Sequence, residues 1–152
     1  MGTIDLFDFP QSGPLVGIDP GSKTLGIAAC DAGRLIASPV ETIKKGRKLG
    51  PSLDRLFELI ETRRIVGLVI GLPLNMDGSE GPRVQSARAL ARNIIERRDL
   101  PIAFQDERLS SSEAERAMIA GDLSRARRAE LIDASAAAII LQTAIDRLAN
   151  AS

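Results

Sequence analysis

The sequence predicts an α/β fold with a mixed five-stranded sheet, formed by an antiparallel meander of three strands plus two parallel strands, and helices on both faces. Two observations predict it. Short apolar runs separated by turn residues come first, and segments of helical periodicity then alternate with further apolar runs. The length of 152 residues suits a single domain, which we place at residues 14–150. Residues 1–13 are expected to form a flexible leader that is ordered only if something holds it.

The meander is predicted from the first apolar runs. Leu15–Asp19 and Thr24–Cys30 flank a Pro-Gly turn, which is typical of a β-hairpin. Asp31–Gly33 then predicts a tight turn into a third strand at Arg34–Ser38. Residues 39–51 contain glycines, prolines and a basic run, so we expect a loop with a positive tip there.

Helices and strands alternate in the remainder. Ser52 can cap a helix that runs to about residue 63, because apolar residues follow it at helical spacing. Ile65–Leu72 is a nearly continuous apolar run, as expected for a strand in a sheet covered on both faces. A polar loop then leads to Pro82, which suits the first turn of a helix ending near residue 97.

The last third predicts one more strand and two helices. Ile102–Phe104 is a short apolar run, and Ser110 or Ser111 can cap a helix that contains residues 113–119. Residues 122–128 are polar and basic, and a long alanine-rich helix is expected at Ala129–Leu148.

Composition excludes several classes of protein. The chain has no histidine, so His-dependent triads and His metal sites are excluded, and catalysis must use carboxylates, Lys, Arg, Ser, Thr or a bound metal. The absence of Trp and Tyr argues against a base-stacking platform. The net charge is zero, so any surface for nucleic acid must be local. A lone cysteine, no membrane-spanning run and no secretion signal fit a cytoplasmic protein.

Acidic residues follow the strands that are expected to run parallel. Asp19 ends the first of these strands, and Asp106 and Glu107 follow the last, so they meet at one edge of the sheet. Asp133 lies near the start of the final helix, on a face of small residues that would pack inward. Because clustered carboxylates repel unless a cation neutralises them, the pattern indicates Mg²⁺ or Mn²⁺ rather than zinc.

Each acid also has a purely structural interpretation. Asp19 alone suits a turn acid that bonds backbone amides, and Asp133 alone suits the favourable dipole near a helix N-terminus. Asp106 and Glu107 can pair with a neighbouring arginine. The sequence does not say which of these two neighbours points inward, because adjacent residues on a strand face opposite sides.

Four segments follow one another along the chain: Gly17–Ala28, Val69–Gly78, Asp106–Ser111 and Asp133–Leu141. In this order they resemble the YqgF family, also called RuvX, and the resemblance spans roughly residues 14–148. The resemblance implies an RNase H-like fold and a metal-dependent nuclease that matures the 5′ end of 16S rRNA, with Holliday junctions in DNA as a rival substrate. It implies Asp19, Glu107 (or Asp106) and Asp133 as catalytic acids and metal ligands. The related RuvC resolvases carry an acid after the strand that here ends at Gly71-Leu72, and its absence leaves the number of metals open.

Basic and polar residues near these segments are predicted to bind the phosphate backbone. Lys23 follows the Asp19 turn, although it also suits a solvated turn lysine. Arg108 can touch the substrate or orient Asp106, and Asn75 can position the substrate or rigidify its loop. The two basic loop clusters are favoured because each flanks a site segment, and they include Lys44, Lys45, Arg127 and Arg128.

Other functions stay open. An Asp-x-Gly pattern from Asp19 to Gly26 also occurs in sugar-kinase-like and actin-like ATP binders, but those proteins need two such domains and this chain supplies one. A non-catalytic nucleic-acid-binding module is a further alternative. Expected partners are structured RNA, a pre-ribosomal particle or branched DNA, and the chain is expected to act as a monomer or a homodimer.

Overall fold

The computed structural model describes residues 4–21, 23–107 and 125–150, with the side chains of the last range described from residue 134 on. Its strands form one mixed sheet in the order β3-β2-β1-β4-β5. Strand β1 pairs antiparallel with β2, and β2 with β3, whereas β1 pairs parallel with β4, and β4 with β5. The predicted mixed sheet is therefore confirmed. The strands are β1 (Leu15–Pro20), β2 (Thr24–Ala29), β3 (Ser38–Lys44), β4 (Gly67–Leu72) and β5 (Ile102–Asp106).

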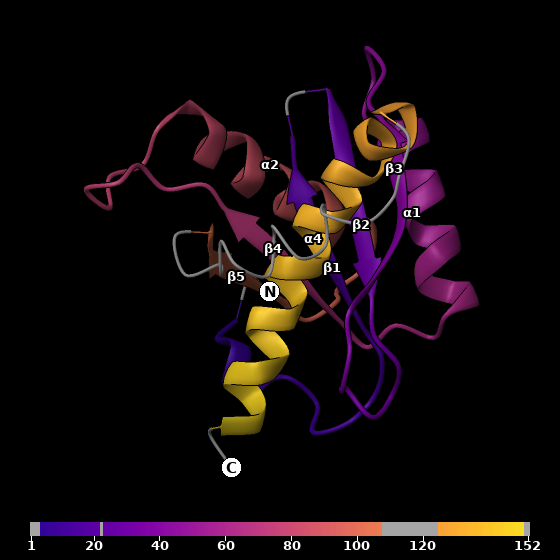
Figure 1. Ribbon diagram of the computed structural model, residues 1–152, viewed down its shortest axis with the longest axis vertical. Helices are drawn as coiled ribbons and strands as arrows, with labels where there is room; N and C mark the ends of the chain where they lie inside the picture. The colour runs from indigo at the N-terminus through magenta and orange to yellow at the C-terminus, as the bar shows by residue number, and fades with distance from the viewer. Residues whose placement is uncertain (1–3, 22, 108–124, 151–152) are drawn as a thin grey trace.

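Helices cover both faces of the sheet, as predicted (Figure 1). Helices α1 (Gly50–Thr62) and α2 (Pro82–Arg97) cover one face, and α4 (Arg125–Asn150) crosses the other. A short 3-10 helix, η1, spans Leu6–Asp8. The helix predicted to contain residues 113–119 lies outside the described residues. No helix in the described parts of the chain is both long and apolar enough to span a membrane.

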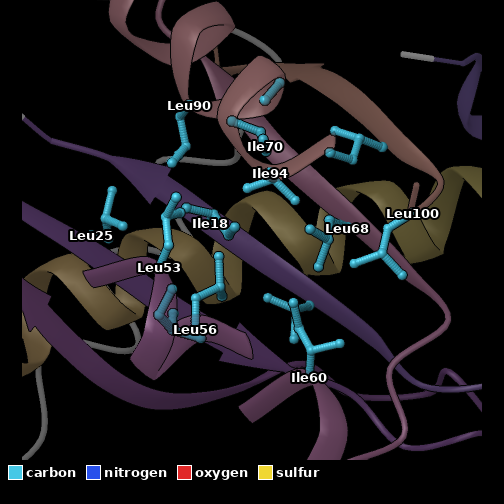
Figure 2. Packing of buried hydrophobic residues seen from close by; sticks show 14 of the residues in the cluster. Ile18, Leu25, Leu53, Leu56, Ile60, Leu68, Ile70, Leu90, Ile94 and Leu100 are labelled. Carbon is cyan, nitrogen blue, oxygen red and sulfur yellow. The ribbon is translucent and has the colours of Figure 1, made fainter. Parts of the chain in front are cut away.

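Because successive side chains of a strand point to opposite faces of the sheet, the buried residues form two separate cores. Ile18, Leu56 and Ile70 are among the fully buried residues between the sheet and helices α1 and α2, and Figure 2 shows this packing. Leu15 and Val69 point to the opposite face and pack with the alanine-rich face of α4. This second core is thinner because small side chains bring α4 close to the sheet.

Gly17 allows the closest approach of α4 to strand β1. A Cβ atom at Gly17 would lie 2.7 Å from Cβ of Leu141 and 2.8 Å from the carbonyl oxygen of Ala137. Both distances are shorter than real Cβ contacts, so only glycine fits at this crossing.

The N-terminal segment, expected to be a flexible leader, is held against the domain from Ile4 on. The backbone N–H of Ile4 donates to the carbonyl of Ile102 at 2.8 Å. The side chains of Leu6 and Phe9 are buried in the core beneath α4. Asp5 caps η1, since its carboxylate accepts a hydrogen bond from the N–H of Phe7 at 3.1 Å.

The predicted third strand, Arg34–Ser38, is wrong, because β3 occupies Ser38–Lys44 instead. The turn after Asp31 places Arg34 in the left-handed region with φ of 54°, and the apolar pair that suggested a strand, Leu35-Ile36, is exposed. Pro39 suggested a loop, but it is tolerated because β3 is an edge strand with a bulge beside Pro39.

Two predicted helix starts are also wrong. Ser52 lies inside α1 and does not cap it: α1 begins at Gly50, and the Ser52 hydroxyl donates instead to the carbonyl of Lys44 at 3.1 Å. Residues 125–128 were expected in a polar loop, but α4 already includes them. Arginine and alanine favour helix strongly, so the basic composition of this segment does not interrupt the final helix.

Candidate active site

Two acidic side chains meet at the carboxyl edge of the parallel strands. Asp19 lies near the end of β1, and Glu107 follows the end of β5. A hydrogen bond links the side chains of Asp19 and Glu107, which requires a shared proton. Burial is the largest of the effects that raise the pKa of Glu107, and together with the hydrogen bond and negative charge of Asp19 it brings that pKa to about 7. The predicted pairing of Asp19 with an acid after the last strand is therefore present.

Gly71 makes this pairing possible. Strand β4 lies between β1 and β5, so the side chain of Glu107 must cross β4 to reach Asp19. A Cβ atom at Gly71 would lie 2.7 Å from Oε1 of Glu107 and 2.5 Å from Cδ1 of Ile140. The sequence indicated that β4 ends without an acid. It did not reveal that the absence of a side chain at Gly71 leaves room for the side chain of Glu107. A glycine inside an apolar strand was the available signal, since it often marks a close approach.

Asp106 faces the other side of the sheet. It pairs in register with Leu72, whose side chain packs in the core beneath α1 and α2. Gln105, one residue earlier, points instead toward α4, where its Oε1 accepts a hydrogen bond from Arg147 at 2.7 Å. Glu107 shares the face of Gln105 by strand alternation. The structure thus brings Glu107 to Asp19 and turns Asp106 away.

The other predicted acid, Asp133, lies on α4, one turn before Ala137, whose backbone touches the Gly17 crossing. The side chain of Asp133 lies outside the described residues, as do Arg108 and the side chains of Arg127 and Arg128. Among the described residues no group of three or more His, Cys, Asp and Glu side chains could hold a metal ion. The role of Asp133 as a third ligand stays a prediction.

Lys45 connects the basic loop to the turn that follows Asp19. Its ammonium group donates to the carbonyl of Gly21 at 2.7 Å, and its backbone N–H donates to the carbonyl of Lys23 at 2.9 Å. Partial burial lowers the pKa of Lys45. Lys45 therefore supports the Asp19 turn, whereas the side chains of Lys23 and Lys44 are exposed beside it.

Asn75 is part of a hydrogen-bonded turn in the loop after β4. Its N–H donates to the carbonyl of Ser79 at 3.0 Å, and its side-chain amide donates to the Ser79 hydroxyl at 3.0 Å. Asp77 accepts from the N–H of Ser79 at 2.9 Å and from its hydroxyl at 2.6 Å. The N–H of Gly78 closes the turn by donating to the carbonyl of Asn75 at 2.8 Å.

A cavity of about 610 Å³ lies between this loop, the start of α2 and Glu107. Arg83, which sequence reasoning did not select, lines it together with Asn75 and Met76. The positive charge of Arg83 lowers the pKa of Glu107, but burial and the contact with Asp19 raise that pKa more strongly. Its place in the first turn of a helix, directly after a loop at the site edge, was the signal that could have identified it.

Comparison with known proteins identifies the family of this chain. The family model described as "RuvX: Holliday junction resolvase" matches residues 13–147. The chain belongs to the RuvX family. The resemblance inferred from the four sequence segments is therefore confirmed.

Relatives in the RuvX family share about half of their residues with this chain. A protein of Phenylobacterium zucineum (strain HLK1), named "Putative pre-16S rRNA nuclease", is 51% identical over 99% of this chain and 99% of its own length. A protein of the same name from Rhodobacter capsulatus is 55% identical over 93% of this chain and 88% of its own length.

Solved structures confirm the RNase H-like fold predicted for this RuvX member. Thermus thermophilus RuvC matches with a TM-score of 0.57 and 18% sequence identity, over 90% of this chain and 96% of that chain. The T. thermophilus RuvC complex with a Holliday junction substrate matches with a TM-score of 0.55 and 16% identity, over the same shares of the two chains. At this identity the likeness concerns the fold.

Proposed function

We propose that this chain is a metal-dependent nuclease that hydrolyses phosphodiester bonds, with the 5′ end of the 16S rRNA precursor as its substrate. The observation that carries the proposal is the contact between Asp19 and Glu107 at the carboxyl edge of β1 and β5. Two carboxylates in contact need a proton or a cation between them.

The donor set fits a hard divalent cation. Asp19 and Glu107 present oxygen atoms only, and no histidine exists anywhere in the sequence to favour zinc. Mg²⁺ or Mn²⁺ can replace the proton shared by the two carboxyl groups, and Asp133 on α4 would supply a third ligand. A bound divalent cation lowers the pKa of an attacking water and stabilises the leaving oxygen of a phosphodiester.

The residues of the chain would then hold the cation and neutralise the substrate. Asp19 and Glu107 would hold the cation at one edge of the sheet, and Gly71 keeps the space for Glu107 open. Exposed basic side chains on both sides, Lys23 and Arg83, would neutralise the phosphates that flank the scissile bond. Since the chain has no histidine, protons would leave to bulk water or to a second phosphate.

The RNA substrate is favoured by the names of the relatives that share about half of their residues with this chain. A bacterial 16S rRNA precursor would place the protein in the cytoplasm and on a pre-ribosomal particle. A four-way DNA junction is the second candidate, because the matching family model carries the description of a Holliday junction resolvase.

The experiment compares cleavage of a 5′-extended 16S rRNA precursor with cleavage of a four-way DNA junction, each with Mg²⁺, Mn²⁺ or EDTA. Wild type is expected to cut the RNA with Mg²⁺ or Mn²⁺ and to be inactive in EDTA. Asp19→Asn is expected to lose at least a hundredfold in rate while keeping its fold, because it removes one charge from the metal site.

Asp99→Asn is the matched control. Asp99 is exposed and lies before β5, at the end of that strand opposite Glu107, so its amide variant should cut like wild type. If wild type cuts only the four-way junction, the substrate is DNA and not the RNA precursor. No cutting of either substrate by folded wild type, with either metal, would refute the nuclease and favour a binding module.

A further inference from the structure

We infer that the cavity beside Glu107 is a subsite for one unstacked nucleotide of the substrate strand, with Arg83 binding its phosphate and Met76 packing against its base. This inference rests on the proposed nuclease function, and it names how the substrate is held next to the acids. Nothing in the sequence comparison assigns a role to this cavity or to Arg83.

The position of the cavity links it to the chemistry. Glu107 forms part of its wall, so a group inside it lies next to the Asp19–Glu107 pair. Its volume of about 610 Å³ falls within the range of about 300–1,000 Å³ that is typical of sites for small molecules. The cavity is therefore large enough for a single nucleotide unit and continuous with the candidate active site.

The wall opposite Glu107 is preformed. Four hydrogen bonds of 2.6–3.0 Å join Asn75 and Asp77 to Ser79 and hold the turn closed. The side chain of Asn75 also contacts Gly81, where an added Cβ would lie 3.4 Å from its Oδ1. A rigid loop lowers the entropic cost of holding a ligand, since little chain must be ordered on binding.

Arg83 is the cationic group of the cavity. Two other arginines of α2 are used in ion pairs: Arg88 binds Glu80 at 2.9 Å, and Arg97 binds Asp54 at 2.7 Å. Among the described residues, Arg83 makes no such ion pair and only acts on Glu107 through its charge. An exposed guanidinium beside a cation site is suited to bidentate contact with a phosphate.

The apolar part of the wall suits a base. Met76 is 91% exposed although it is large and apolar, and Leu74 lines the same cavity. A thioether is polarisable and packs favourably against flat π-systems such as a nucleobase. A base that packs against Met76 would have to leave the stack of a duplex, so the nucleotide bound here would be unstacked.

The test is fluorescence anisotropy with labelled 12-nucleotide single strands of RNA and of DNA, in Ca²⁺ and at several salt concentrations. Arg83→Gln is expected to weaken binding about tenfold and to lower the salt slope by about 0.7, as for one phosphate contact on a single strand. Arg92→Gln is the matched control, because Arg92 is exposed on the same helix but lies about two and a half turns further on, on the opposite side of the helix from Arg83. It should bind like wild type.

A second variant distinguishes the contribution of the base to binding from that of the phosphate. Met76→Ser removes an exposed side chain, so the fold is preserved. It is expected to weaken binding of the strand with bases severalfold and to leave unchanged the binding of an abasic strand of the same length. Arg83→Gln should weaken binding of both strands.

The two proposals fail in different ways. Wild type that cuts and binds, with Arg83→Gln binding as tightly as Arg92→Gln, overturns the subsite and leaves the nuclease standing. Wild type that neither binds nor cuts overturns the nuclease and the subsite together. Tighter binding of the RNA or of the DNA strand, with the Arg83 effect present, supports the subsite and identifies its substrate.

Discussion

The side chain of Glu107 crosses β4 directly over Gly71, so that a Cβ atom at Gly71 would lie 2.7 Å from Oε1 of Glu107. Gly71→Ala is therefore expected to displace Glu107 from Asp19 and to press on Ile140 of α4. Overpacking of this kind costs about 1–3 kcal/mol of unfolding free energy. The effect on function should be larger: the rise in melting temperature caused by Mg²⁺ should disappear together with cleavage.

Gly17→Ala is the control for Gly71→Ala. It creates an equally close contact, 2.7 Å to Cβ of Leu141, against the same helix and without touching Glu107. It should lower stability at least as much, because the carbonyl of Ala137 and the Cβ atom of Leu141 cannot move aside as side-chain ends can, and it should keep more of the stabilisation by Mg²⁺. If both variants lose the response to Mg²⁺ equally, the position of α4 determines metal binding and the space over Gly71 does not.

The raised pKa of Glu107 predicts a pH dependence of stability in EDTA. The carboxyl group of Glu107 ionises near its ordinary pKa of 4.5 in the unfolded chain and at about 7 in the folded chain. Folding thus takes up a proton between these values. The contribution of this group is full below pH 4.5 and is lost as the pH rises to 7.

The measurement is urea unfolding of wild type and Glu107→Gln between pH 4.5 and pH 8. Circular dichroism must follow it, because the chain has no Trp or Tyr to report by fluorescence. The stability of wild type relative to Glu107→Gln should fall as the pH rises, and saturating Mg²⁺ should reduce this slope because the cation replaces the proton. A flat difference would mean that the two carboxyl groups are not in contact in solution.

Lys45 is predicted to act on the site through the Asp19 turn. Lys45→Met keeps most of the side-chain volume and removes the 2.7 Å hydrogen bond to the carbonyl of Gly21. We expect a loss of about 1 kcal/mol in unfolding free energy and severalfold weaker Mg²⁺ binding by calorimetry. Lys48→Met, an exposed position on the same loop, should change neither. Weaker RNA binding with unchanged stability would instead make Lys45 a direct phosphate ligand.

Much of the fold followed from the sequence because it depends on local patterns. Unbroken apolar runs predicted β1 and β4, and Pro82 predicted the start of α2, which begins at that residue. The third strand failed because Leu35-Ile36 has the apolar character of a strand, while the left-handed backbone at Arg34 directs this pair to solvent. Pairing along the edge of the sheet is a tertiary property that a local pattern does not contain.

The candidate site was predictable only in part. Strand ends predicted that Asp19 and an acid after β5 would meet, but the choice of Glu107 over Asp106 required the register of Asp106 with Leu72. Arg83 was missed because its importance comes from a cavity, and a cavity is formed by a loop and a helix start that only the folded chain brings together.

The anchoring of α4 gives the last prediction. Gln105 is fully buried on the face that carries Glu107, and its Oε1 accepts a 2.7 Å hydrogen bond from the guanidinium of Arg147. Arg147→Met should cost about 1–3 kcal/mol, because it leaves a buried amide oxygen without this donor. Adding Gln105→Leu should recover most of that loss, since the polar group is then absent as well. Urea unfolding of the single and double variants measures the coupling. Additive losses would show that the hydrogen bond does not contribute, and that Arg147 stabilises α4 through its cation–π contact with Phe7, whose ring centre lies 5.5 Å from the guanidinium carbon.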